Sequence, residues 1–277
     1  MQTAVDEATE EQAIDDNTVV APARPTGRAA AVCYGVYGWL TFLVCLAAAV
    51  PGALLLPGLE RRRRWVGAAA RAWFVVAGIR VTLTGLERIP AGHCIVVANH
   101  ASYMDGMILQ ALLPPRFSFV IKGEMKKVPF AHLLLRRIGS RFVERFAAGA
   151  SARDARRLLR AAAAGESLVF FPEGTFHPEP GLHAFRAGAF AAAIKAGLPV
   201  VPLAIRGSRQ ILPARGRLPR RSRLELTVLE PIAPEHRDFH VSRTLAEAAR
   251  QRILRALGEP DRTDGRPAHA GRPTGRG

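Results

Sequence analysis

A run of 31 residues without a charged side chain, residues 29–59, constrains this chain more than any other feature. A helix needs about 20 apolar residues to cross a bilayer, so the run is long enough to span a membrane once. Pro51 and Gly52 predict a break, which leaves a long apolar piece, residues 29–50, and a shorter one, residues 53–59. Two arrangements stay open: a spanning helix, or a helical hairpin that enters one leaflet and returns.

Four arginines and a tryptophan, residues 61–65, follow the apolar run directly. Such side chains gather at the headgroup layer on the cytoplasmic side, where each basic residue contributes about 1 kcal/mol near an anionic surface. We therefore expect residues 29–65 to anchor the chain to membrane phospholipid, with its active site on the cytoplasmic face. A solvated charge run is the alternative.

The charge balance favours an anionic partner. The chain has 39 Lys and Arg against 23 Asp and Glu, a formal net charge of +16. Membrane phospholipid, nucleic acid, an acidic protein and a phosphorylated substrate all fit this excess. Arginine dominates the basic residues and matches phosphate oxygens with its planar fork, although a GC-rich genome would produce the same bias.

Beyond the apolar run, strand-like and helix-like segments alternate, which predicts an α/β fold: a mixed, largely parallel sheet flanked by helices. The predicted strands are residues 79–84, 94–98, 117–121, 140–143, 168–171, 200–205 and 224–229. The predicted helices are residues 105–113, 128–138, 151–164, 183–196 and 242–257. The expected organisation is a disordered acidic tail (1–28), the membrane anchor (29–65), one catalytic domain (66–257) and a disordered C-terminal tail (258–277).

His100 follows the apolar residues 94–98, which predict a buried strand. Open α/β sheets place their sites at the carboxyl ends of strands, so His100 is expected in the turn there. On one continuous helix, His100 and Asp105 would point about 140° apart, so they meet only if Asp105 begins the next helix. A carboxylate on one ring nitrogen leaves the other free as a base. The alternative is a strand-end histidine beside a helix cap.

Two later segments also place polar side chains after predicted strands. Residues 142–145 end in Arg145, and residues 170–176 carry Glu173, Gly174 and Thr175 after an apolar strand that stops at a proline. A guanidinium matches phosphate oxygens, a carboxylate accepts a hydrogen bond from a hydroxyl, and glycine lets a ligand approach the backbone. A surface arginine and a carboxylate that caps a turn are the alternatives.

Taken in order, residues 99–105, 139–145, 170–176 and 200–205 resemble the motifs of the glycerolipid acyltransferases, the family of 1-acylglycerol-3-phosphate acyltransferases. The resemblance implies transfer of a fatty acyl group from acyl-CoA or acyl-carrier protein to the free hydroxyl of a lysophospholipid. It implies no metal, no cofactor beyond that thioester co-substrate, and no nucleic acid. His100 would be the general base and Asp105 its orienting partner. The implied acceptor-binding residues are Arg145, Glu173, Gly174, Thr175 and Arg186.

Phe176 departs from the family pattern, because many members carry arginine or serine after the threonine. An acceptor with another head group, such as an aminoacyl lipid, a glycolipid or lysophosphatidylcholine, therefore stays open. A non-catalytic basic protein that binds anionic lipid or nucleic acid is the alternative from another class. It would explain the arginine clusters, but not the ordered appearance of His100, Asp105 and Glu173.

Overall fold

The computed structural model describes residues 27–143, 148–213, 216–234 and 241–263. The strands are β1 Arg80–Thr84, β2 Ile95–Ala98, β3 Ser118–Lys122, β4 Arg141–Val143, β5 Leu168–Phe170, β6 Val200–Arg206 and β7 Arg223–Val228. The α-helices are α1 Arg28–Leu55, α2 Leu59–Val76, α3 Asp105–Leu112, α4 Pro129–Arg137, α5 Ala148–Ala163, α6 Gly188–Ala196, α7 Ser208–Ile211 and α8 Val241–Leu257. Two short 3-10 turns are η1 Leu86–Arg88 and η2 Gly123–Lys127.

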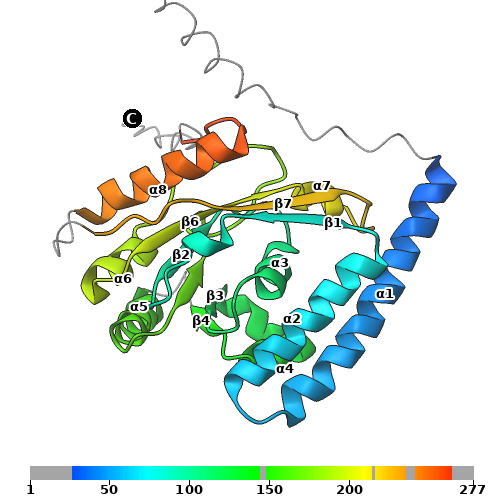
Figure 1. Ribbon diagram of the computed structural model, residues 1–277, viewed down its shortest axis with the longest axis horizontal. Helices are drawn as coiled ribbons and strands as arrows, with labels where there is room; N and C mark the ends of the chain where they lie inside the picture. The colour runs from blue at the N-terminus through cyan, green and yellow to red at the C-terminus, as the bar shows by residue number, and fades with distance from the viewer. Residues whose placement is uncertain (1–26, 144–147, 214–215, 235–240, 264–277) are drawn as a thin grey trace, which may run out of the picture.

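The strands form one seven-stranded sheet in the order β1-β7-β6-β2-β5-β3-β4 (Figure 1). β6 and β7 run antiparallel, and the other neighbouring pairs are parallel. β2 lies at the centre between β5 and β6, and all of its residues are buried. The predicted α/β class with a mixed, largely parallel sheet is confirmed.

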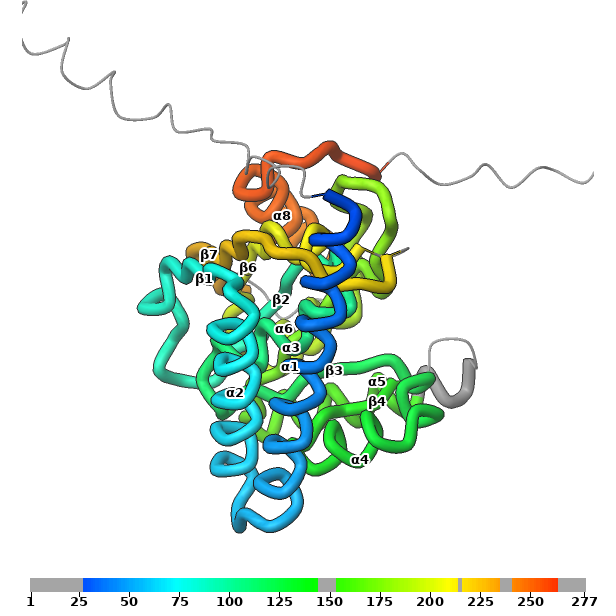
Figure 2. Tube along the Cα trace, turned by 90° about the vertical axis from the view of Figure 1, so that its right-hand side faces the viewer, coloured from blue at the N-terminus to red at the C-terminus, as the bar shows by residue number. Residues whose placement is uncertain are grey.

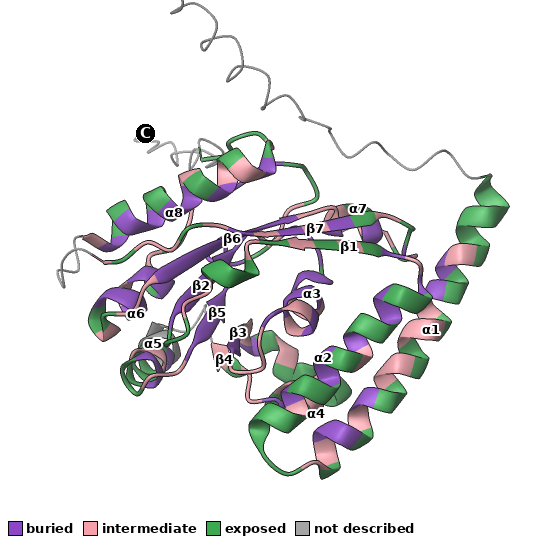
Figure 3. Cartoon of the chain, viewed as in Figure 1, coloured by how far each residue is buried: buried purple, intermediate pink, exposed green. Residues whose placement is uncertain are grey.

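Helices cover both faces of the sheet, because successive side chains of a strand point to opposite faces. Val96 and Ala98 of β2 belong to a core shared with α2 and α3. Ile95 and Val97 belong to a second core shared with α5, α6 and α8. Figure 3 shows the result: the central strands are buried between helices that are buried on one side and exposed on the other, whereas the edge strand β1 is partly exposed.

The N-terminal apolar run forms α1, which pairs with α2 as a helical hairpin beside the sheet (Figures 1 and 2). The predicted break at Pro51 is wrong, because α1 continues through the proline to Leu55. Trp65 of α2 packs directly on Gly52, and its indole donates a hydrogen bond to the carbonyl of Ala48 at 2.9 Å. Packing of a neighbouring helix thus keeps α1 intact through the proline. Within the described residues, α1 alone is long and apolar enough to cross a membrane.

The turn of this hairpin lies at residues 56–58, near the end of the apolar run and not at Pro51. The boundary expected between residues 65 and 66 falls inside α2. Trp73 and Phe74, on the same helix as the arginines, are almost fully buried in the core over the sheet. The hairpin therefore packs on the α/β sheet through the C-terminal half of α2.

Three other expected boundaries differ in the structure. α5 begins at Ala148 and not at a cap on Ser151, because the alanine-rich residues before Ser151 favour a helix. α6 begins at Gly188 and not at His183, because His183 is held by tertiary contacts, including a hydrogen bond from Arg250 to its carbonyl. Residues 259–263, expected to be disordered, pair with the backbone at residue 182. Most of both expected tails, and Arg145, lie outside the described residues.

Candidate active site

Asn99 anchors the turn that follows β2 at the centre of the sheet. Its Nδ2 donates to the carbonyl of Ile205 at 2.9 Å, and the amide of Ile205 donates to its Oδ1 at 2.7 Å. Since Ile205 belongs to β6, this double hydrogen bond joins two neighbouring parallel strands near their carboxyl ends. The turn therefore presents His100 at the edge of the sheet where α/β proteins place their sites.

His100 and Asp105 meet across this turn. His100 Nδ1 lies 2.8 Å from Asp105 Oδ2, and α3 begins at Asp105, as the five-residue spacing required. The same carboxylate oxygen accepts the backbone N–H groups of Ala101 at 2.7 Å and Ser102 at 2.8 Å. The Asp105 side chain is fully buried, whereas that of His100 is 20% exposed. With Nδ1 facing the carboxylate, Nε2 is the ring nitrogen available for proton transfer.

Glu173 holds the same turn through its carboxylate. The sequence predicted instead that this carboxylate binds a hydroxyl of the acceptor. Its Oε1 accepts the backbone N–H of His100 at 2.7 Å, and its Oε2 accepts that of His183 at 3.0 Å. Burial raises the pKa of Glu173 to about 7, against the opposing effect of these two hydrogen bonds. Both carboxylate oxygens are thus engaged by the protein, and the side chain holds the backbone of His100.

Aromatic rings surround the His100 imidazole. Phe171 stacks on it with ring centroids 4.4 Å apart, and Phe176 meets it edge to face at 4.9 Å. Tyr103, which is 70% exposed, in turn contacts the Phe176 ring at 4.6 Å. Phe171 and Tyr103 were not predicted as site residues, although both lie inside the recognised motifs at residues 170–176 and 99–105. These rings fix the imidazole and give the mouth of the site an aromatic surface.

A cavity of about 640 Å³ opens beside His100 and extends between the sheet and the hairpin. Apolar side chains from four elements form its wall. They are Phe42, Leu46 and Ala49 of α1, Val66, Ala69 and Trp73 of α2, Met107 of α3, and Leu134 and Leu135 of α4. A long apolar cavity that begins at a histidine suits a substrate with a hydrocarbon chain.

The remaining predicted site residues fall into three groups. Gly174 and Thr175 line the cavity close to His100, and Gly174 has the positive φ of 83° that favours glycine. Arg186 is exposed and does not line the cavity, and its backbone N–H donates to the carbonyl of Pro172. Arg145 lies outside the described residues. Within the described ranges, no three His, Cys, Asp or Glu side chains are grouped to hold a metal ion.

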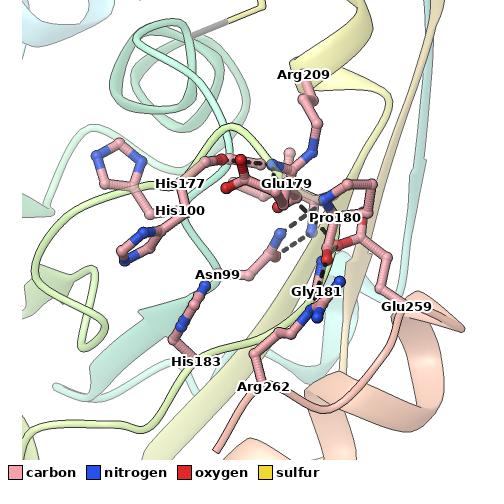
Figure 4. Close-up of polar contacts among 12 residues, drawn as sticks. Asn99, His100, His177, Glu179, Pro180, Gly181, His183, Arg209, Glu259 and Arg262 are labelled. Carbon is pink, nitrogen blue, oxygen red and sulfur yellow. Dashed lines mark hydrogen bonds and ion pairs between the residues drawn. The ribbon is translucent and has the colours of Figure 1, made fainter. Parts of the chain in front are cut away.

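The loop after Phe176 is fastened by side chains from the C-terminal half of the chain (Figure 4). Arg209 donates to the carbonyl of His177 at 2.6 Å and pairs with Glu259 at 3.3 Å. Glu259 also accepts the backbone N–H of Gly181 at 2.6 Å. This network fixes the loop that leads to His183, whose amide holds Glu173. Residues far apart in sequence thereby set the position of His100.

Comparison with known proteins agrees with this geometry. The family model described as Acyltransferase matches residues 80–206, which include the His100, Asp105 and Glu173 positions. A lyso-ornithine lipid O-acyltransferase of Pseudomonas aeruginosa is 31% identical over 80% of this chain and 87% of its own length. A 1-acyl-sn-glycerol-3-phosphate acyltransferase of the same organism is 34% identical over 61% of this chain and 64% of its own. A chloroplastic enzyme of that name from Brassica napus is 26% identical, and this chain covers 56% of its length.

A solved structure shares the fold. The 1-acyl-sn-glycerophosphate acyltransferase PlsC from Thermotoga maritima superimposes with a TM-score of 0.70 at 22% identity, covering 83% of this chain and 95% of that one. An α/β sheet with a histidine–carboxylate pair at its carboxyl edge, above a long apolar cavity, defines the class of protein as an acyltransferase. More closely, the chain belongs to the glycerolipid acyltransferase family, the relatives of the 1-acylglycerol-3-phosphate acyltransferases.

Proposed function

We propose that this protein transfers a fatty acyl group from acyl-CoA or acyl-carrier protein to the free hydroxyl of 1-acyl-glycerol-3-phosphate, which gives phosphatidate. The observation that carries the proposal is the contact of 2.8 Å between His100 Nδ1 and Asp105 Oδ2 at the mouth of the apolar cavity. The names of several relatives support this acceptor, since they are 1-acyl-sn-glycerol-3-phosphate acyltransferases.

In the proposed mechanism, His100 Nε2 removes the proton from the acceptor hydroxyl while that oxygen attacks the thioester carbonyl. An ester bond forms, the carbon–sulfur bond breaks, and the imidazolium returns the proton to the leaving thiolate. Asp105 stabilises the imidazolium, and base assistance of this kind contributes about 10²–10⁴ in rate. Because the acceptor hydroxyl is itself the nucleophile, no residue of the protein is acylated.

The cavity gives the acyl chain of the donor a place next to this base. Its wall is mostly apolar, so a hydrocarbon chain would be removed from water at about 25 cal/mol per Å² of buried apolar surface. A chain held there places its carbonyl carbon at the mouth, beside His100. Holding two reactants in this way accounts for a large share of catalysis in bimolecular reactions.

The acceptor head group has a second candidate, because the mouth of the site is aromatic. Phe176 contacts His100 at the position where many family members place arginine or serine after the threonine, and Tyr103 contacts the Phe176 ring. An aromatic face accommodates a cationic or neutral head group better than a phosphate. A relative that is 31% identical over 80% of this chain is named for a lyso-ornithine lipid. Acylation of an aminoacyl lysolipid is therefore the alternative function.

We infer that α1 enters one leaflet of the membrane from the cytoplasmic side. A helix of 28 residues is about 42 Å long and could span the bilayer. Other parts of the protein, however, contact α1 at several points along its length. The hydroxyl of Tyr34 donates to Ala77 O at 2.8 Å, and the indole of Trp39 donates to Arg217 O at 2.7 Å. Crossing the bilayer would carry these polar partners and the loop at residues 217–219 into hydrocarbon, which is costly. The exposed apolar side chains of α1 fit a leaflet instead: Val32, Val36, Leu40, Leu43 and Val44.

The proposed function is tested with purified membranes and three lysolipid acceptors: lysophosphatidate, a lyso-ornithine lipid and lysophosphatidylcholine. We expect His100→Ala to lower acyl transfer by about 10²–10⁴ and Asp105→Asn to lower it strongly as well. His132→Ala is the control, because this histidine contacts Phe142 on the outer side and does not line the cavity. Mass spectrometry of the lipid product identifies the transferred acyl chain and the acceptor together. Undiminished turnover by the His100→Ala protein would remove the assignment, and a product from the lyso-ornithine lipid alone would favour the alternative acceptor.

A further inference from the structure

A second cavity, of about 510 Å³, lies at the opposite edge of the sheet. Residues at or just before the amino ends of four adjacent parallel strands line it: His93 before β2, Ser118 in β3, Arg141 in β4 and Ser167 before β5. α2 closes it with Leu59 and Arg63. Since the His100 site occupies the carboxyl edge, this cavity has no part in the chemistry proposed above.

Arg63 brings a buried positive charge to this cavity. Only 4% of the residue is exposed, and its guanidinium donates to Ile138 O at 2.8 Å, Pro115 O at 3.2 Å and Ser118 Oγ at 2.6 Å. All three acceptors are neutral. Buried charges are normally balanced by an opposite charge, so the surroundings of Arg63 favour an anion.

Two further arginines line the same cavity. Arg116 donates through its two terminal nitrogens to the carbonyls of Pro90 and Ala91, and Arg141 pairs with Glu166. Glu166 is the one carboxylate that the described residues contribute to the lining. Three guanidinium groups against one carboxylate leave two positive charges around the cavity.

Two buried polar atoms in this lining also lack a hydrogen-bond partner among the described residues. They are Nε of Arg116 and Oγ of Ser140, and Ser140 also lines the apolar cavity beside His100. A buried donor without an acceptor is rare in folded proteins, and a bound group with several acceptor oxygens would satisfy both. Phosphate oxygens match guanidinium and hydroxyl donors in this way.

We propose that this cavity binds a phosphate-bearing anion at a site separate from the acyl-transfer site. Its volume exceeds that of a phosphate alone, so it accommodates an attached organic group as well. Leu59 places it at the start of α2, beside the arginines of residues 61–64 and the turn of the hairpin. Both a lipid phosphate and a soluble phosphate compound can reach such a position.

The test titrates the full-length protein, in an uncharged detergent, with inorganic phosphate at constant ionic strength. Arg141→Gln removes one positive charge, so we expect phosphate affinity to fall about tenfold. Glu166→Gln removes the opposing carboxylate and frees Arg141, so we expect affinity to rise about tenfold. Arg255→Gln is the control, because this exposed arginine lies on α8, across the sheet. A gain of affinity in Glu166→Gln cannot result from misfolding.

If phosphate bound only at the acyl-transfer site, the wild-type, Arg141→Gln and Glu166→Gln proteins would bind it with equal affinity. This result would overturn the proposal. Absence of phosphate binding to the wild type would overturn it too. Sedimentation with phosphatidylcholine vesicles that contain phosphatidylglycerol separates the two sources. If the occupant is a lipid head group, vesicle binding follows the same order among the variants. If it is a soluble phosphate, the variants differ in phosphate affinity but bind equally to the vesicles.

Discussion

Replacing Asn99 with alanine removes the double hydrogen bond that joins the ends of β2 and β6. The backbone N–H and C=O of Ile205 both lose their partner, in a place where Asn99 is 4% exposed and Ile205 is 2% exposed. An unsatisfied buried polar group costs about 1–3 kcal/mol, so we expect a loss of about 2–6 kcal/mol in the free energy of unfolding. For a domain of this size, that loss lowers the unfolding temperature by at least about 4 °C.

The same change should lower turnover, because His100 directly follows Asn99. A misplacement of about 1 Å costs about 10²-fold in rate, so we expect kcat to fall between about tenfold and hundredfold. The acceptor KM should not change, since Asn99 does not line the cavity. Thermal unfolding and steady-state acyl transfer measure the two effects. Thr84→Ala on the edge strand β1 is the control, because the hydrogen bonds of the Thr84 side-chain hydroxyl are long, at 3.3 and 3.5 Å.

A loss of stability below about 1 kcal/mol in Asn99→Ala would contradict the energetic argument. An increase in KM at unchanged kcat would show instead that Asn99 touches the acceptor. Either result would refute the view that this side chain acts only by fixing the turn that carries His100.

Three further changes test other parts of the structure. Burial raises the pKa of Glu173 from 4.5 to about 7. The preference of the folded state for the protonated carboxyl therefore stabilises the protein fully below about pH 4.5, and this stabilisation is lost as pH rises through 7. Denaturant unfolding from pH 4 to 8 should show the wild type losing up to about 3 kcal/mol relative to Glu173→Gln, which does not titrate at this position; parallel curves would contradict this. Gly52→Ala places a Cβ 2.1 Å from the Trp65 ring, so we expect about 1–3 kcal/mol lower stability and weaker vesicle binding, with Gly92→Ala, where a Cβ meets nothing, as the control. Ala69→Phe fills part of the apolar cavity and should shift donor preference to shorter acyl chains in a competition assay; an unchanged product profile would place the chain elsewhere.

The strand–turn–helix around His100 was predictable because its determinants are local. A β-branched run ends at Ala98, a carboxylate follows five residues after His100, and a helix begins at that carboxylate. The same local logic located the strands of the sheet to within a residue or so. Glu173 was predicted as a site residue for a similar reason, since it comes three residues after the end of a buried strand.

The role of Glu173 was not predictable, because its partners are backbone amides at positions 100 and 183. The wall of the apolar cavity was not predictable either. Which face of α1 packs on the protein depends on close contacts such as that of Gly52 with Trp65, and these also overrode the helix-breaking tendency of Pro51. The order of residues 259–263 depends on Arg250 and residue 182, distant partners that no local pattern reveals.

Because Phe42, Leu46 and Ala49 of α1 form part of the cavity wall, the helix that we propose as the membrane attachment also shapes the proposed substrate chamber. Deleting α1 to obtain a water-soluble protein would therefore leave this cavity open on one side, and the proposed His100–Asp105 dyad would lose the adjoining apolar wall. Under the proposed function, residence in the bilayer and preference for chain length would then be coupled, since one helix contributes to both.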